Sequence, residues 1–221
     1  MELLLSCYNG GMRTIPREVL RQKRSDPVET TRRPLDWTNE SDAVLIAYLL
    51  GMLGDATYNK QHRTWRITQA NKEWLQTLKD MLLRLGYRSW MYREGKQRKV
   101  YALETTAKSL TKEVDPRNLG TIEERTAYVR GYFDAEGGVP RQITHRMYIQ
   151  FSQKNKDELN KLSEVLGENG IRCGKIHCPS SKVDPDYWRF FIACQSHQDF
   201  IQKIGSWHPR KNQILQSRVK I

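Results

Sequence analysis

The amino-acid sequence predicts an α+β fold made of two copies of one unit, each with the element order αββαββα and about 80 residues long. Two apolar helices that end in acidic residues begin the two copies, and each is followed by an alternating strand and an amphipathic helix. The spacing also repeats, because Gln69 and Gln153 are 84 residues apart while Asp55 and Glu136 are 81 apart. We expect a pseudo-twofold arrangement with antiparallel sheets, divided into an Arg-rich arm over residues 1–37 and repeats over 38–120 and 121–221.

The second acidic helix is expected over residues 122–136. Thr121 can cap its start, Glu124 follows at the reciprocal capping-box spacing, and two glycines follow the last acid. Asp134 and Glu136 lie at the negative end of the helix dipole. Each negative charge there destabilises the helix by about 0.3–1 kcal/mol unless a positive group lies nearby. We therefore expect a cation there, with Asp134 as a supporting or surface group on a different helical face from Glu136.

The first acidic helix has the same construction and ends near Asp55. A glycine inside a helix costs about 1 kcal/mol relative to alanine, so Gly51 and Gly131 indicate positions where two backbones approach closely. If the two helices pack on each other, Asp55 and Glu136 come to lie side by side.

These two stretches resemble the paired nine-residue motif of the LAGLIDADG homing endonucleases, and the resemblance extends over about residues 40–216. In the second copy Glu136 matches the metal-binding acid of the motif, with glutamate in place of aspartate. In the first copy Asp55 matches that acid and Ala56 replaces the final glycine. Three residues separate Gly51 from Asp55, against four between Gly131 and Glu136, so either Leu50 takes the glycine position or the first helix is one residue short.

The elements after the first motif are expected in a fixed order. An alternating strand is predicted over residues 62–69, and a helix capped by Asn71 is predicted to extend to Leu85. A hairpin over 89–93 and 98–105 and a short helix near 107–114 complete the copy. In the second copy the corresponding strand is predicted over 146–153, the helix over 155–170, the hairpin over 171–178 and 187–194, and a closing helix over 198–207.

An antiparallel sheet with helices on one face leaves its other face free for a ligand. Arg and Gln can read guanine and adenine in the DNA major groove, while Ser, Thr and Tyr contact bases or phosphates. On two saddle-shaped sheets the residues predicted to contact DNA are Arg66, Thr68, Arg93, Arg146, Tyr148, Gln150, Ser152, Lys175, His177 and Arg189.

The family resemblance also implies a catalytic site. Asp55 and Glu136 would hold Mg²⁺ or another divalent cation, because hard carboxylate oxygens suit such ions. Gln69 and Gln153 match a glutamine that positions solvent. The implied basic residues are Lys154 and Lys211, with Arg117 as a weaker counterpart of Lys211. The alternative without a function is that Asp55 and Glu136 are ordinary helix-end acids exposed to water. For Gln69 and Gln153 it is that they only cap the ends of strands.

Composition agrees with a polyanionic partner, since 37 Lys and Arg against 25 Asp and Glu give a net charge of +12. The four cysteines form no CxxC pair and are expected to be reduced thiols, and no apolar run reaches the length of a membrane span. We expect an intracellular protein of the cytoplasm or nucleoid, with an organelle matrix also open. The arm over residues 1–37 is either a solvated lead-in or a DNA-contacting segment.

Together these features predict a monomeric, site-specific double-strand DNA endonuclease, carried by a mobile intron, with a long non-palindromic target. The first alternative is a maturase on the same fold that binds intron RNA. The second is a DNA-binding protein without catalysis. The presence of both acids favours the enzyme, and the short first motif favours a decayed site.

Overall fold

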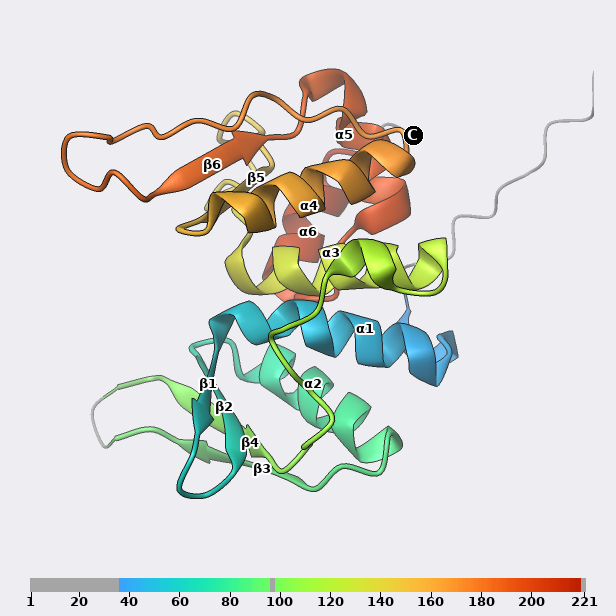
Figure 1. Ribbon diagram of the computed structural model, residues 1–221, viewed down its shortest axis with the longest axis vertical. Helices are drawn as coiled ribbons and strands as arrows, with labels where there is room; N and C mark the ends of the chain where they lie inside the picture. The colour runs from blue at the N-terminus through green and yellow to red at the C-terminus, as the bar shows by residue number, and fades with distance from the viewer. Residues whose placement is uncertain (1–35, 96–97, 220–221) are drawn as a thin grey trace, which may run out of the picture. The chain divides into compact units, whose positions relative to one another are not determined.

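The computed structural model describes residues 36–95 and 98–219. Most of the predicted arm, the tip of the first hairpin at residues 96–97 and Cys7 therefore lie outside the described residues. Two helices, α1 (Asp42–Met52) and α3 (Ile122–Glu136), lie side by side in the middle, and each repeat packs its sheet and remaining helices outward from them (Figure 1).

The predicted close approach of these two helices is confirmed. A Cβ atom added to Gly131 would lie 2.0 Å from the carbonyl oxygen of Tyr48, and one added to Gly51 would lie 2.0 Å from that of Tyr128. The two contacts are reciprocal, so Gly51, and not Leu50, takes the glycine position of the first motif. A side chain at either position would push the helices apart.

Both helices begin at the predicted kind of cap. The Oγ atom of Ser41 accepts a hydrogen bond from the amide of Val44, and Oγ1 of Thr121 accepts one from the amide of Glu124. The carboxylate of Glu124 accepts from the amide of Gly120, one residue before the position that a capping box requires. The predicted bounds 122–136 are those observed.

The first repeat contains a four-stranded antiparallel sheet in the order β1-β2-β4-β3. Its strands are β1 (Ala56–Asn59), β2 (Thr64–Gln69), β3 (Ser89–Arg93) and β4 (Tyr101–Thr105). Helix α2 (Lys72–Arg84), capped by Asn71 as predicted, buries Trp74, Leu75 and Leu78 in the core that it shares with α1 and this sheet. The predicted helix over 107–114 is wrong, since this segment forms turns before the 3₁₀ turn η3 (Pro116–Asn118).

The second repeat keeps less regular strand. Its sheet pairs β5 (Gln150–Gln153) with β6 (Trp188–Phe191), so the predicted strand over 146–153 is observed only in its second half. The segment 171–178 forms only isolated bridges, Cys173 to Ile192 and His177 to Arg189. Between these two bridges the segment 171–178 advances four residues while the opposite strand advances three. A bulge of one residue therefore interrupts this arm of the hairpin.

The helices of the second repeat cover one face of its sheet. Helix α4 (Lys156–Glu168) begins at Asn155 as predicted. The predicted closing helix over 198–207 is observed in part. The chain is helical from α5 (His197–Asp199) through the π-helical η5 (Phe200–Ile204), after the 3₁₀ turn η4 (Cys194–Ser196), and the helix ends at Gly205 with φ +60°. Helix α6 (Pro209–Gln216), which was not predicted, follows.

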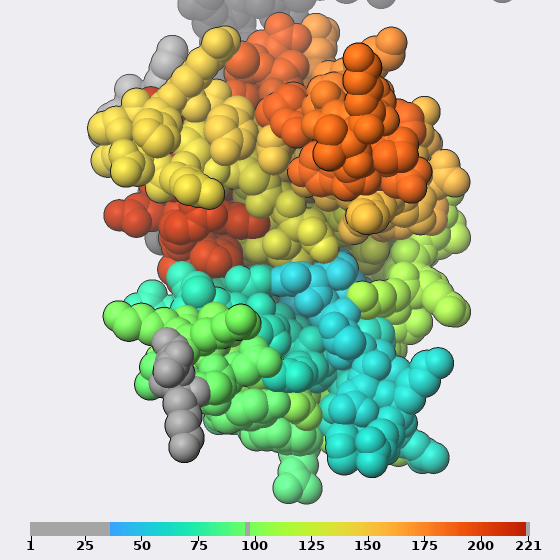
Figure 2. All heavy atoms as spheres, turned by 90° about the vertical axis from the view of Figure 1, so that its left-hand side faces the viewer, coloured from blue at the N-terminus to red at the C-terminus, as the bar shows by residue number. Residues whose placement is uncertain are grey.

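Each repeat therefore has its own apolar core, and the helix pair joins them. Figure 2 looks at the ends of the helix pair, with the second repeat in yellow to red above and the first in cyan to green below. Among the described residues no helix is both long and apolar enough to cross a membrane.

Candidate active site and nucleic-acid face

Asp55 lies where the first motif helix changes its winding. Helix α1 stops at Met52 and the chain continues as the 3₁₀ turn η2 (Leu53–Asp55), which completes a turn in three residues instead of 3.6. The first motif is thus one residue short, as one of the two sequence interpretations held. The Nε2 atom of Gln69, at the end of β2, donates a hydrogen bond to Oδ2 of Asp55.

Glu136 ends α3 and lies against the first motif. A Cβ atom added to Gly54 would lie 3.3 Å from Cγ of Glu136 and 3.6 Å from its Oε1. Burial raises the pKa of Glu136, and the nearby charge of Asp55 raises it further. Burial also raises the pKa of Asp55, although the hydrogen bond from Gln69 opposes this. The fold has brought one carboxylate from each repeat into one half-buried site.

Lys211 is the positive group expected at the end of the second motif helix. Its Nζ atom donates to the carbonyl oxygens of Phe133 (2.6 Å), Asp134 (2.9 Å) and Gly137 (2.6 Å). It thereby caps α3 in place of the missing next turn. Burial lowers the pKa of Lys211 to about 8, although the charges of Asp134, Asp55 and Glu136 oppose this shift.

The first repeat has a counterpart to Lys211 that the sequence did not reveal. The Nζ atom of Lys112 lies 3.4 Å from the carbonyl oxygen of Gly54, and its charge lowers the pKa of Asp55 and of Glu136. Arg117, the predicted counterpart, instead pairs with Asp115 and Glu164, so that assignment is wrong. Lys112 follows Asp55 by 57 residues and Lys211 follows Glu136 by 75, so no common spacing could have found it.

Two cavities flank the acids and mirror each other. The larger, of about 490 Å³, is lined by Gln69, Ala70, Asn71, Asp134, Ala135, Gly137, His208, Arg210 and Lys211. The smaller, of about 180 Å³, is lined by Leu50, Gly51, Leu53, Gly54, Lys112, Tyr128, Tyr132, Gln153, Asn155 and Glu158. Each combines the motif-helix end and the lysine of one repeat with the strand-end glutamine of the other. We call them the Lys211 pocket and the Lys112 pocket.

Asp134 does not lie on the surface. It is 1% exposed and accepts hydrogen bonds from the hydroxyls of Tyr48 and Ser206 and from the amides of Trp207 and His208. Because Tyr48 belongs to α1, this carboxylate ties the first repeat to the segment before α6. Its predicted supporting role is consistent with this position, and its predicted surface alternative is wrong.

Neither Gln153 nor Lys154 donates a hydrogen bond to a carboxylate of the site in this structure. Oε1 of Gln153 accepts a hydrogen bond from the backbone amide of Lys154 at 2.7 Å, and the structure shows no bond from Gln153 to a carboxylate. Lys154 is exposed and is not among the residues lining either pocket. Gln69 and Gln153 thus occupy mirrored pockets but make different contacts.

Comparison with protein families finds a LAGLIDADG-like domain that matches residues 43–115 and 123–205. The chain belongs to this LAGLIDADG family. Both acids lie within the two matched segments, and so do Gln69, Gln153 and Lys112. Comparison with the sequences of characterised proteins finds no match.

Solved structures share the LAGLIDADG fold of the chain. I-DmoI in complex with DNA and Mn is 21% identical, with a TM-score of 0.56 over 75% of this chain and 98% of that one. Mesophilic variants of the homing endonuclease I-DmoI give 21% identity and a TM-score of 0.59, over 80% and 99% of the two chains. Full-length DUF199/WhiA from Thermatoga maritima gives 16% identity and 0.59, over 82% and 62%. At these identities the likeness establishes the fold.

The first LAGLIDADG repeat has a mixed polar and aromatic free face. The register places Arg66 and Thr68 opposite Glu104 and Ala102, on the face away from the buried Ile67 and Leu103. Arg66 is bound there by Glu94 at 2.6 Å. The predicted placement of Arg93 on this face is wrong, because it alternates with Met91 on the helix side.

The second repeat presents the face that the sequence predicted. Gln150, Ser152 and Arg189 share one side of the β5–β6 pair, opposite the buried Phe151 and Phe190. His177 bridges to Arg189 on that side, and Tyr148 packs edge-on to Phe191, which lies opposite Gln150. Lys175 lies in the bulged segment and Arg146 in the extended segment before β5, and both are exposed.

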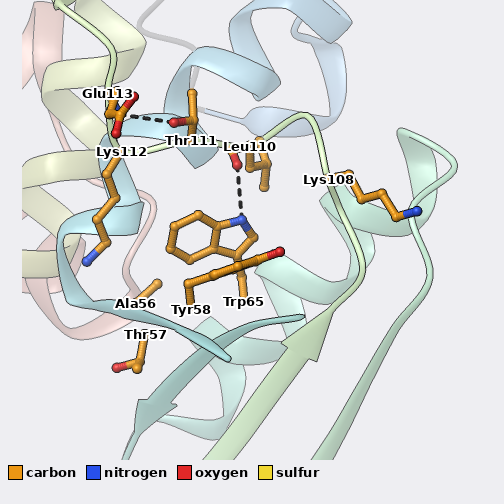
Figure 3. A pocket seen from close by; sticks show the side chains of 9 residues that line it. All are labelled: Ala56, Thr57, Tyr58, Trp65, Lys108, Leu110, Thr111, Lys112 and Glu113. Carbon is orange, nitrogen blue, oxygen red and sulfur yellow. Dashed lines mark hydrogen bonds between the residues drawn. The ribbon is translucent and has the colours of Figure 1, made fainter. Parts of the chain in front are cut away.

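A further cavity, of about 600 Å³, is lined by none of the residues assigned to the acid site except Lys112 (Figure 3). In it the exposed ring of Tyr58 lies against that of Trp65, with ring centroids 4.9 Å apart, and Nε1 of Trp65 donates to the carbonyl oxygen of Leu110. Both aromatic residues lie on the helix side of β1 and β2, and the turn segment after β4 borders them. This cavity therefore opens on a different face from the predicted DNA contacts.

Proposed function

We propose that this LAGLIDADG protein is a site-specific double-strand DNA endonuclease that uses a divalent cation. The observation that carries the proposal is the meeting of Asp55 and Glu136 at the ends of the two motif helices, where a lysine binds each helix end and Gln69 donates to Asp55. A protein that only binds DNA gains nothing from two half-buried carboxylates placed where a phosphate would approach.

The residues present fit a divalent cation. Asp55 and Glu136 offer hard oxygen ligands, and burial raises the pKa of each, so a bound cation would relieve the cost of their charge. Among the described residues no cluster of three or more His, Cys, Asp or Glu is found, so water and phosphate oxygens would complete the coordination. Mg²⁺ is the ion that we propose, since it retains several waters in such sites.

The chain itself would supply positioning and charge. A divalent cation held by Asp55 and Glu136 would neutralise the scissile phosphate and lower the pKa of an attacking water. Gln69 and Gln153 would orient water from opposite sides. Lys112 and Lys211 would stabilise negative charge on the phosphates of the two strands. Because one chain contains both halves of the site, a monomer suffices.

DNA binding would use the free faces of the two sheets. In the first repeat (residues 38–120) Arg66 and Thr68 would contact the duplex. In the second (residues 121–221) the contacts would come from Arg146, Tyr148, Gln150, Ser152, Lys175, His177 and Arg189. The faces differ in sequence, so the proposed target is non-palindromic.

A non-catalytic DNA-binding protein is the second candidate. The structural likeness to WhiA and the one-residue contraction of the first motif favour it. In that case the same sheets would bind DNA and the acids would be remnants.

Cleavage of a plasmid library of intron-insertion sequences with Mg²⁺ separates the two candidates. We expect wild type to cut, and Asp55→Asn and Glu136→Gln to bind the selected target while cutting at least about 10³-fold more slowly. Without metal at neutral pH both variants should melt no lower than wild type, since each removes a charge that burial disfavours. Glu113→Gln, an exposed acid beside the Tyr58 cavity, is the matched control. Target binding by a wild type that never cuts would establish the second candidate instead.

A further inference from the structure

A buried tyrosine hydroxyl near Glu136 makes no well-formed hydrogen bond to the part of the chain that the structure describes. Tyr132 follows Gly131 in α3 and is 2% exposed, and its ring stacks on Phe151 with centroids 6.2 Å apart. Its hydroxyl oxygen is buried and no described residue meets the distance and angle of a hydrogen bond to it, although the side-chain amide of Gln153 is close enough to oppose the effect of burial on its pKa. Such a group costs about 1–3 kcal/mol, so unpaired hydroxyls are rare in native proteins and call for a physical reason.

Tyr132 belongs to the Lys112 pocket. Tyr132 lines this cavity together with Gln153 and Lys112. The ring is close to the acid site, because a Cβ atom added to Gly54 would lie 3.9 Å from Cε2 of Tyr132 and 3.6 Å from Oε1 of Glu136. Tyr132 therefore borders a cavity of about 180 Å³ that Lys112 and Gln153 also line, and this cavity is large enough for water.

The other half of the site has no equivalent. The residue after Gly51 in the first motif is Met52, whose thioether cannot donate a hydrogen bond. Among the described residues that line the Lys211 pocket, none carries a hydroxyl group. Burial raises the pKa of Tyr132 above its usual range, so the hydroxyl keeps its proton at any pH at which the protein would work.

We propose that Tyr132 is a positioning residue, whose hydroxyl donates a hydrogen bond to the water that Gln153 orients in the Lys112 pocket. This inference rests on the proposed nuclease function. It makes the two halves of the site chemically unequal, since one half holds its water with a tyrosine and a glutamine and the other with a glutamine alone. Removing the hydroxyl should therefore affect one strand of the duplex.

The test is single-turnover cleavage by Tyr132→Phe on a target duplex with each strand labelled separately, at saturating protein and Mg²⁺. Phenylalanine keeps the stacking on Phe151 and removes only the oxygen. We expect one strand to be cut about 10-fold more slowly, the loss of roughly one hydrogen bond, and the other at the wild-type rate. Tyr58→Phe, which removes an exposed hydroxyl outside both pockets, should leave both rates unchanged.

Thermal melting gives a readout that does not depend on cleavage. Tyr132→Phe should melt at or above the wild-type temperature, because it removes an unpaired buried hydroxyl. A lower melting temperature would mean that the hydroxyl has a partner within the protein and would overturn the inference. Unchanged rates, or equal slowing of both strands, would overturn it as well while leaving the nuclease function standing. A wild type that cuts no DNA removes the proposed function and this inference together.

Discussion

The two repeats are most alike where they touch and least alike at their outer edges. Gly51 and Gly131 make the same reciprocal contact, and Asn71 and Asn155 cap corresponding helices. Away from the helix pair the first repeat has four paired strands, whereas the second has two and a bulged arm. A helix pair packed backbone to backbone constrains both partners equally, while a sheet edge tolerates bulges and irregular chain.

The same contrast appears between the two lysines. Lys211 is 5% exposed and holds three carbonyl oxygens of α3, whereas Lys112 is exposed and holds one carbonyl oxygen at 3.4 Å. A backbone bond closes the end of each motif helix, from the amide of Ala56 to the carbonyl oxygen of Leu53 in the first and from the amide of Gly137 to that of Phe133 in the second. Lys211 and Lys112 lie at equivalent helix ends, but we expect Lys211 to contribute more to the stability of the fold.

The largest expected effect comes from breaking the helix contact. Gly131→Val places side-chain carbon against the backbone of Tyr48, so we expect a loss of at least about 3 kcal/mol in unfolding free energy, measured by urea denaturation. Gly167→Ala in α4 is the control, since nothing lies within 4 Å of its added carbon, and it should gain about 0.5–1 kcal/mol. Equal effects of the two substitutions would contradict the backbone contact.

An intermediate effect should separate the two lysines. Lys211→Met removes a buried donor from the carbonyl oxygens of Asp134 and Gly137, while that of Phe133 keeps its bond from the amide of Gly137, and we expect the substitution to cost about 2–4 kcal/mol of unfolding free energy. Lys112→Met should cost less than about 0.5 kcal/mol, because it changes an exposed side chain. Both should slow cleavage if both lysines face phosphate. Urea denaturation of the two variants decides whether the lysines differ as the structure indicates.

The pH dependence of stability gives a second view of Lys211. Its pKa of about 8 in the fold lies below the ordinary lysine value of 10.5, so between these pH values the unfolded chain binds more protons at this group. The contribution of Lys211 to stability should therefore rise as pH increases from 8 to 10.5. This rise should disappear in Lys211→Met and persist in Lys112→Met.

The smallest effect concerns the two glutamines. The hydrogen bond from Gln69 lowers the pKa of Asp55 against the raising effect of burial, so Gln69→Ala should raise that pKa further. Because a cation must displace the proton, Mn²⁺ binding to Gln69→Ala should be lost at a higher pH than in wild type as the solution is acidified. Gln153→Ala, whose glutamine donates to no carboxylate, should show no such shift. Calorimetric titration of the full chain between pH 5 and 8 measures both.

Local sequence was sufficient for the features that depend on a few neighbouring residues. The caps at Thr121, Asn71 and Asn155, the amphipathic helices after them and the two acidic motif helices all follow from side-chain chemistry and a 3.6-residue period. The helix predicted over 198–207 is observed as far as Ile204, as α- and then π-helix. The wrong segment, 107–114, has helical composition but forms turns in the fold. There, contacts with other segments outweighed local propensity.

The sequence by itself determined the residues to which we assign the proposed chemistry: one acid per repeat on a glycine-containing helix, and a glutamine at the same place after each. Tertiary structure alone decided which groups surround them. In the fold Lys112 and not Arg117 lies at the end of the first motif, and Asp134 is buried against Tyr48. Arg93 lies on the helix side of its sheet, and Tyr132 lies beside a cavity. The physical reason is that a motif depends on residues close together along one helix. The groups that surround it belong to chain segments tens of residues away, and their spacing in the sequence follows no period.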